Sequence, residues 1–180
     1  MSHGIARFIR SNHPNAASHD VLVFSATIIL NTLVVTLAVL LAGLLFGRFW
    51  EAALLLFSYV LLRFFSGGMH LHTSKHCNIV SIAMFLILLF LPVTYWNIGF
   101  ILNIAALLLV IVFAPTKDIM HLNLLGPKYT PHFKLASIAI VSLNFWLQLP
   151  ILSLAFIAQG LSLTPPAYKA AELLKGGEKS

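Results

Sequence analysis

Charged side chains are scarce in this sequence of 180 residues. Only 9% of the residues are Asp, Glu, Lys or Arg, whereas 59% are apolar. A soluble domain of this length needs far more polar surface to cover its core, so a water-soluble globular fold is excluded. Residues 21–47, 76–116 and 135–168 contain no charge at all. Because a transmembrane helix needs about 20 mostly apolar residues, the sequence predicts a polytopic integral membrane protein of the all-α class.

Cysteine and acidic residues are scarce as well. Cys77 is the only cysteine, which excludes an intrachain disulfide and leaves a free thiol. The 11 Lys and Arg residues outnumber the 5 acidic residues, and they are scattered among short loops. This pattern favours contact with anionic lipid or an acidic peptide over nucleic acid. No short apolar segment with a small-residue cleavage site precedes Val21, so a removable signal peptide is not expected.

Interruptions divide the long apolar runs into short spans. Pro92 and the residues Tyr95 and Trp96, which favour the membrane interface, separate two spans within one uncharged run. The first four spans are therefore predicted at residues 21–47, 49–63, 79–95 and 98–114. The last run contains Gln148 and Pro150 near its middle, so it forms either one kinked helix or a hairpin of two short helices.

The distribution of positive charge favours the hairpin and about six short spans. With six spans, ten of the 11 Lys and Arg residues fall on one side of the membrane, and Arg48 stands alone on the other. With five spans the charges divide more evenly. The positive-inside rule therefore predicts both termini in the cytoplasm. Residues 1–20 are expected to form a cytoplasmic interfacial leader, residues 21–164 the transmembrane domain, and residues 165–180 a cytoplasmic tail helix.

Reactive side chains gather in the loop 63–77, between the second and third spans. His70, His72, His76 and Cys77 lie within eight residues of one another, just after the flexible pair Gly67-Gly68. A cysteine nucleophile acts as its thiolate, and a nearby imidazole can accept the thiol proton. On a straight helix His70 and Cys77 would lie about 10.5 Å apart along the axis, so cooperation requires the segment to bend back.

Arg63, Gly68, His70 and Cys77, at this spacing between hydrophobic spans, resemble the signature of the accessory gene regulator B (AgrB) family. Members are bacterial membrane endopeptidases that process quorum-sensing peptide precursors. The resemblance implies His70 and Cys77 as the catalytic pair, in a loop facing the cytoplasm. It also implies a short, membrane-associated, AgrD-like pro-peptide as substrate, which is cleaved through a Cys thioester and cyclised to a thiolactone or lactone. A homodimer and activity without a metal or other cofactor are further implications.

Four neighbouring residues are candidates for supporting roles, each with a simpler alternative. Arg63 marks the end of a span, or it holds a substrate carboxylate or orients the loop. Gly67 and Gly68 form a turn, and one of them could direct a backbone N–H group toward an oxyanion. Ser74 either assists the site by hydrogen bonding or caps the third span.

Two other classes of protein fit part of the pattern. His70, His72, His76 and Cys77 are all competent zinc ligands, which would suit a metal-handling protein or a small transporter. The sequence has no His-Glu-x-x-His motif, however, and its membrane spans are nearly free of the acidic residues that cation relays use. Asp118 could orient His70 or pair with Lys117. A membrane scaffold without chemistry is the third class, and an unreactive Cys77 would indicate it.

Overall fold

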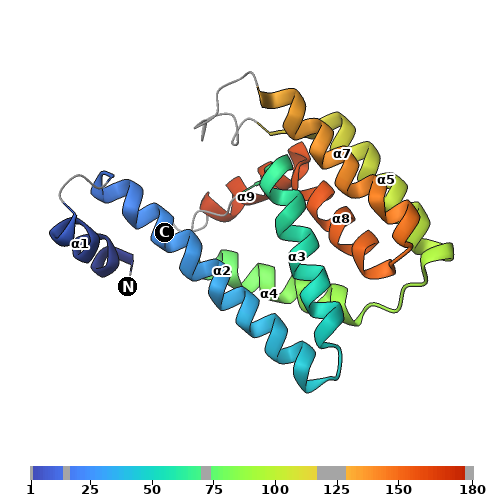
Figure 1. The fold of residues 1–180 in the computed structure, drawn as a ribbon, viewed down its shortest axis with the longest axis horizontal. Coiled ribbons are helices and arrows are strands. Elements are labelled where there is room, and N and C mark those ends of the chain that lie inside the picture. The colour runs from blue at the N-terminus through green and yellow to red at the C-terminus, as the bar shows by residue number, and fades with distance from the viewer. Residues whose placement is uncertain (1, 14–16, 70–73, 117–128, 177–180) are drawn as a thin grey trace.

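The computed structural model describes residues 2–13, 17–69, 74–116 and 129–176, and every regular element in these ranges is a helix (Figure 1). The elements are α1 Ser2–Asn12, α2 His19–Leu45, α3 Phe49–Ser66, α4 Ser74–Phe90, the π-helical turn η1 Tyr95–Gly99, α5 Phe100–Phe113, α7 Thr130–Leu147, α8 Pro150–Ser162 and α9 Pro165–Gly176. The predicted all-α class is confirmed.

Three helical segments are long and apolar enough to cross a bilayer, namely α2, α3 and the continuous segment Tyr95–Phe113. Helices α8 and α9 together supply a fourth if a pair bent by 69° counts as one span. The predicted number of six is therefore not confirmed. Two of the predicted spans are short: the 13 residues of α8 rise only about 20 Å, and the apolar part of α4, Cys77–Phe90, is similar. Helix α7 has 18 residues, but its first turns contain the polar residues Thr130, His132 and Lys134.

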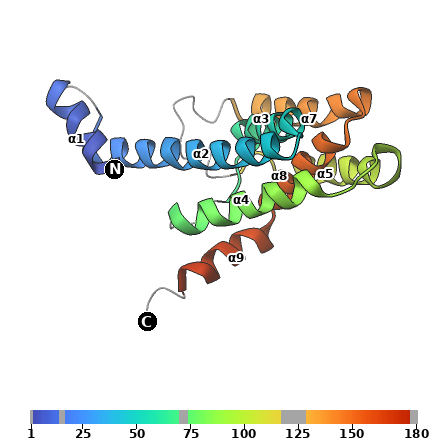
Figure 2. The ribbon, with the colours of Figure 1, turned by 90° about the horizontal axis from the view of Figure 1, so that it is seen from below.

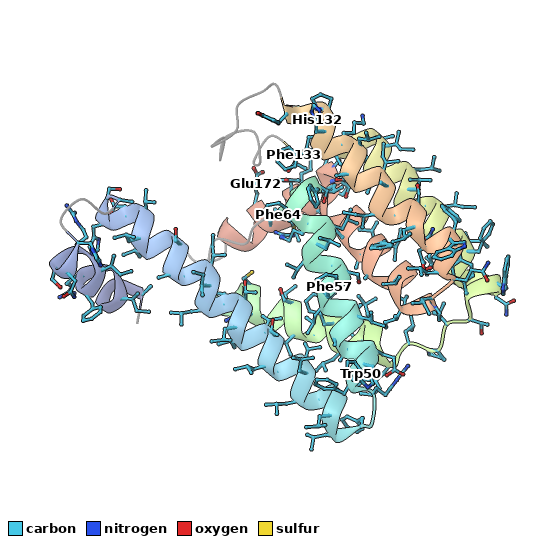
Figure 3. The ribbon with its side chains drawn as sticks, in the orientation of Figure 1. Trp50, Phe57, Phe64, His132, Phe133 and Glu172 are labelled. Atoms are coloured by element: carbon cyan, nitrogen blue, oxygen red, sulfur yellow. The ribbon has the colours of Figure 1, made fainter. Side chains whose placement is uncertain are left out.

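Large apolar side chains remain exposed on the outer faces of the helices. On α3, Trp50, Phe57 and Phe64 follow one another at seven-residue intervals along one face, and each is at least 67% exposed (Figure 3). On α2, Ile29 and Leu41 are also exposed. Continuous apolar surface of this kind is unfavourable in water and favourable against lipid tails. The outer surface thus supports the predicted membrane location of the bundle.

The breaks between helices follow the interruptions in the sequence. Gln148 adopts a left-handed conformation with φ of 56° and ends α7, and Pro150 occupies the first turn of α8. Proline suits this position because the first helical N–H has no partner within the helix. The chain reverses direction at this break, so α8 runs back beside α5 (Figure 1). The last apolar run therefore forms the two short helices of the predicted hairpin.

Helix α8 is the centre of the bundle. It packs chiefly against α3 and α5, and most of its side chains are buried. Figure 2 shows α2, α3 and α7 in one layer, with α4 and α5 on the opposite side and α9 beyond α4. Gly160 permits the close approach of α8 to α5, because a Cβ atom there would lie 3.2 Å from Leu109 Cδ1. Small residues serve this purpose in membrane helix packing.

Buried amides join α5, α7 and α8 inside this bundle. Asn144 Nδ2 donates to Asn103 Oδ1 at 3.1 Å and lies 3.0 Å from Ser153 Oγ. The side-chain oxygen of Asn144 accepts from the backbone N–H of Leu149, in the turn between α7 and α8. Because an unsatisfied polar group is costly away from water, these mutual bonds stabilise the hairpin and its position against α5.

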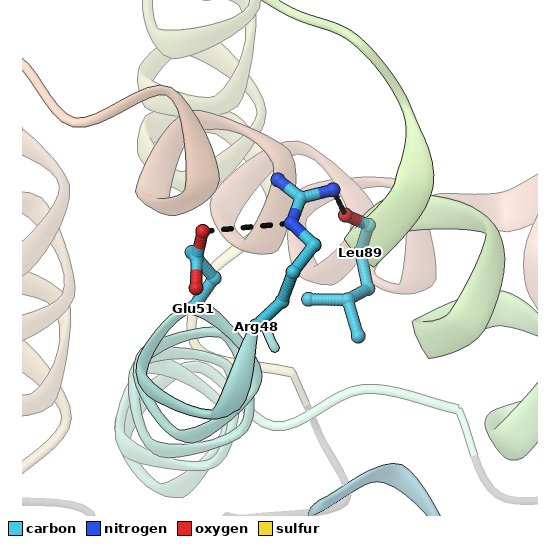
Figure 4. Close-up of polar contacts among 3 residues, drawn as sticks. All are labelled: Arg48, Glu51 and Leu89. Atoms are coloured by element: carbon cyan, nitrogen blue, oxygen red, sulfur yellow. Dashed lines mark hydrogen bonds and ion pairs between the residues drawn. The ribbon is translucent and has the colours of Figure 1, made fainter. Parts of the chain in front are cut away.

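Arg48 joins the turn between α2 and α3 to the end of α4 (Figure 4). Its Nη1 donates to the backbone carbonyl of Leu89, and its Nε lies 3.5 Å from Glu51 Oε1. This contact places the beginning of α3 beside the end of α4. The loop of reactive residues joins the end of α3 to the beginning of α4.

Candidate functional site

Two glycines end α3 and redirect the chain. Gly67 has φ of 80° and Gly68 has φ of 134°, conformations that side chains with a Cβ atom rarely adopt. The N–H of Gly67 still donates to the carbonyl oxygen of Arg63, which closes the last helical turn. The described chain then reaches Met69, the residue before His70. The predicted role of Gly67 and Gly68 as turn residues agrees with this geometry.

The segment Gly67–Met69 is held by helix α8, which is distant in sequence. Gln159 is fully buried, and its Nε2 donates to Ser66 Oγ at 3.0 Å and to the carbonyl oxygen of Gly67. The N–H of Met69 donates to the carbonyl oxygen of Ser162 at 3.2 Å. These bonds fix the backbone of the segment against the central helix.

Thr116 supplies a third attachment from the chain that follows α5. Its backbone N–H donates to the carbonyl oxygen of Ser66 at 3.0 Å, and its Oγ1 accepts from the N–H of Gly68 at 3.2 Å. Pro115 follows the last residue of α5, Phe113, by two positions, as expected for a residue that ends a span. The loop is consequently connected both to α8 and to the chain that follows α5 before it reaches residue 70.

Arg63 belongs to the same polar cluster. The guanidinium donates through Nη2 to the carbonyl oxygen of Met69, and Nη1 lies 3.5 Å from both Gln159 Oε1 and Tyr59 Oη. Hydrogen bonds from a charged donor are stronger than neutral ones, and more so where water is scarce. The arginine is thus placed to orient the loop. The sequence had left open this role, the binding of a substrate carboxylate, and a simple position at the end of a span.

Gly68 has no room for a side chain. A Cβ atom there would lie 2.7 Å from Ser162 Oγ and 3.1 Å from Arg63 Nη1. Both residues also bond to Met69, Arg63 as donor to its carbonyl oxygen and Ser162 through a carbonyl oxygen that accepts from its N–H. Glycine is therefore required at this position for two separate reasons, its backbone conformation and its contact with the polar cluster.

A partly open cavity of about 190 Å³ lies between α2, α3 and α4. Arg63, Met69, Cys77 and Ser162 are among its lining residues, and apolar side chains such as Val35 and Phe85 supply much of the rest. Cys77 is half-buried in the first turn of α4 and is a free thiol. Cys77 and Arg63, both selected from the sequence, therefore line the same cavity as Met69, the residue that precedes His70.

Several predicted residues lie outside the described part of the chain. These are His70, His72 and Asp118, together with the side chains of Ser74 and His76. The pairing of His70 with Cys77 and the role of Ser74 thus stay predictions. Among the described residues, no group of three or more His, Cys, Asp and Glu side chains could hold a metal ion.

The sequence analysis missed the polar residues of α8. Gln159 and Ser162 bind the glycine segment from more than 90 positions away, and Asn78 lines the cavity next to Cys77. One signal could have identified Gln159, because an amide inside an apolar span is expensive unless it binds a partner or serves a function. Its partner could not be read from the sequence.

The helices and the site together define a polytopic membrane protein with a cysteine in the lining of a partly open cavity. The model of the accessory gene regulator B family matches residues 2–164, and the chain belongs to this family. An "AgrB-like protein" of Halalkalibacterium halodurans is 27% identical over 175 residues, which cover 93% of this chain and 89% of that protein. No solved structure matches. Membership connects the chain with peptide processing in accessory gene regulator quorum sensing.

Proposed function

We propose that this chain is a membrane cysteine endopeptidase that cleaves a short, AgrD-like quorum-sensing pro-peptide, with Cys77 as nucleophile and His70 as base. The observation that carries the proposal is the shared cavity: Cys77, Arg63 and Met69 all line it, and Met69 directly precedes His70. The hydrogen bonds of Gly67–Met69 to α8 support it, because a catalytic base needs a backbone held in one geometry.

The proposed reaction begins with proton transfer from the Cys77 thiol to His70. The thiolate attacks the carbonyl carbon of the scissile peptide bond, and a carbon–sulfur bond forms as the oxygen becomes an oxyanion. When the intermediate collapses, the carbon–nitrogen bond breaks, and the imidazolium of His70 gives its proton to the departing amine. The signal segment is then a thioester of Cys77, and the C-terminal tail of the pro-peptide leaves.

Cyclisation follows when a cysteine or serine side chain within the signal segment attacks the thioester. The new bond closes a thiolactone or lactone ring and returns the Cys77 sulfur as a thiol. Water competes for the same thioester and would give a linear acid. The apolar lining of the cavity disfavours water and thereby favours ring closure over hydrolysis.

Supporting roles follow from the positions of the neighbouring residues. Arg63 orients the loop through the carbonyl oxygen of Met69, and Gly67 and Gly68 provide the turn that its contacts with α8 require. Ser74 caps α4 or donates a hydrogen bond to the site. These assignments need no metal or other cofactor.

The wider arrangement is part of the same proposal. Residues 1–20 form an interfacial leader and residues 165–180 a tail helix, both cytoplasmic, around the membrane peptidase domain of residues 21–164 with its catalytic loop 63–77. The cytoplasmic placement is supported by the excess of Lys and Arg expected on that side under a six-span topology. The protein is expected to act in the bacterial cell membrane as a homodimer.

Alkylation of Cys77 tests the proposed pair without any substrate. In nanodiscs at pH 7, iodoacetamide is expected to modify Cys77, and His70→Ala to slow the reaction at least about fivefold, because the variant lacks the base that forms the thiolate. His72→Ala is the matched control and should leave the rate unchanged. Peptide mapping by mass spectrometry gives the rate. Equal rates in the wild type and both variants would show an ordinary thiol and contradict the proposal.

A further inference from the structure

The side-chain amide of Gln159 lies at the junction between the loop and helix α8. It is fully buried, and it contacts several polar groups at once. Its Nε2 donates to Ser66 Oγ at 3.0 Å and to the carbonyl oxygen of Gly67. Its Oε1 lies 3.5 Å from Arg63 Nη1 and 3.1 Å from Ser162 Oγ. Both ends of this amide therefore have partners.

Two of these partners have opposite hydrogen-bonding capacity. The guanidinium of Arg63 can only donate, and the carbonyl oxygen of Gly67 can only accept. A side chain between them must therefore accept on one side and donate on the other. The amide of Gln159 does both without carrying a charge. An apolar side chain of the same length does neither, and both partners then lose a bond in a place that water does not reach.

The groups held by Gln159 directly precede His70 in the chain. Gly67 lies three positions before the histidine. Arg63 donates to the carbonyl oxygen of Met69, the residue next to His70. A change at Gln159 therefore acts on the start of the glycine turn and on the arginine that holds its end. The geometry required of a catalytic base depends on supporting contacts of this kind.

The packing of α8 against α3 does not depend on this amide. Leu55 and Leu62 of α3 and Ala155 of α8 are fully buried members of one apolar core. An amide in such surroundings is costly unless its bonds are made, and a polar side chain within an apolar membrane helix indicates a functional role. The donor bonds of Gln159 go to the end of α3 and to the turn beyond it.

We infer that Gln159 is a positioning residue of the proposed peptidase: its amide holds the glycine turn and Arg63 together and thereby places His70 for proton transfer from Cys77. This inference rests on the proposed function. It predicts that Gln159 affects the reactivity of Cys77 mainly through His70. A residue that only maintained the fold would act whether or not the histidine is present.

A double-mutant cycle on the alkylation of Cys77 tests this path. Gln159→Met keeps the length of the side chain and removes both its donor and its acceptor, and Gln159→Leu does the same with a different shape. Each change is made alone and together with His70→Ala. The rate of iodoacetamide modification at Cys77 is measured in nanodiscs at pH 7 by mass spectrometry, and size-exclusion chromatography reports whether each variant is folded.

In the protein that retains His70, each Gln159 variant is expected to lower the rate at least about threefold. In the His70→Ala background, the same changes should leave the rate within about 1.5-fold, because the group that they misplace is absent. Asn103→Leu is the matched control and should leave the rate unchanged in both backgrounds. It removes another fully buried amide, one whose bonds go to α7.

The possible results separate positioning from stability and from the chemistry. A wild-type rate in either folded Gln159 variant overturns the inference while the proposed catalytic pair stands. Slowing by the same factor with and without His70, or failure of both variants to fold, assigns Gln159 to the stability of the bundle and also overturns the inference. If His70→Ala alone leaves the rate of the wild type unchanged, the proposed function itself is overturned.

Discussion

Cys77→Ala is expected to abolish cleavage of a co-expressed pro-peptide, and His70→Ala to reduce it at least about 100-fold. The first change removes the atom that forms the covalent bond. The second removes the group that takes up and returns the proton, a contribution of typically 10²–10⁴ in rate. The measurement is the fraction of an epitope-tagged precursor cleaved in cells, and any short reading frame beside this gene that encodes a central cysteine or serine is the first precursor to test.

The controls for this experiment come from the same loop. His72→Ala changes a histidine two positions from His70 and should leave cleavage within about twofold of the wild type. Membrane levels of each variant, measured on a fluorescent fusion, separate lost chemistry from lost protein. Cleavage that continues in Cys77→Ala would remove the sulfur from the mechanism. A requirement for His72 equal to that for His70 would instead favour a group of metal ligands.

Gly68→Ala has the next largest expected effect, a loss of cleavage of at least about 100-fold. A Cβ atom at this position would lie 2.7 Å from Ser162 Oγ and 3.1 Å from Arg63 Nη1, in a backbone conformation with φ of 134°. The segment must then move, and the bonds from Arg63 to Met69 and from Gln159 to Gly67 are lost with it. Since a displacement of 1 Å can cost about 10² in rate, the catalytic loop should lose its geometry.

Gly47→Ala provides a matched control in the same chain. Gly47 also has a positive φ, of 70°, but a Cβ atom there would meet nothing within 4 Å. The variant thus carries the backbone strain, about 1–2 kcal/mol, without the collision. It should express in the membrane and retain cleavage within a few-fold of the wild type. If Gly47→Ala and Gly68→Ala are equally active, the close packing of the glycine segment has no part in catalysis.

The positions of the helices were predicted from the sequence more accurately than the number of helices that cross the membrane. Gaps between charges and the interruption at Pro150 located most helix boundaries to within a few residues, but α4, Ser74–Phe90, lies five residues before the predicted span 79–95 and ends ahead of Pro92. Apolar composition does not distinguish a helix that faces lipid from one buried in the bundle, because both are apolar on every side. Helix α8, with only 13 residues, is of the second kind, so its contribution to the number of spans could not be predicted.

The local part of the site was also predictable, whereas its supporting contacts were not. Arg63, Gly68 and Cys77 lie within one short segment, where spacing carries information. Gln159 and Gly67 are 92 residues apart, and their bond exists only because α8 packs against α3. A single sequence contains no signal that pairs two such positions.

A thioester on Cys77 is the intermediate on which the whole account depends, and its capture is the most direct test. A precursor whose internal cysteine or serine is changed to alanine cannot close the ring, so the acyl-enzyme should accumulate. After an acid quench, intact-protein mass spectrometry should show the mass of the signal segment added at Cys77. Neutral hydroxylamine should then remove it. Cleavage of this precursor with no adduct at Cys77 would contradict the account.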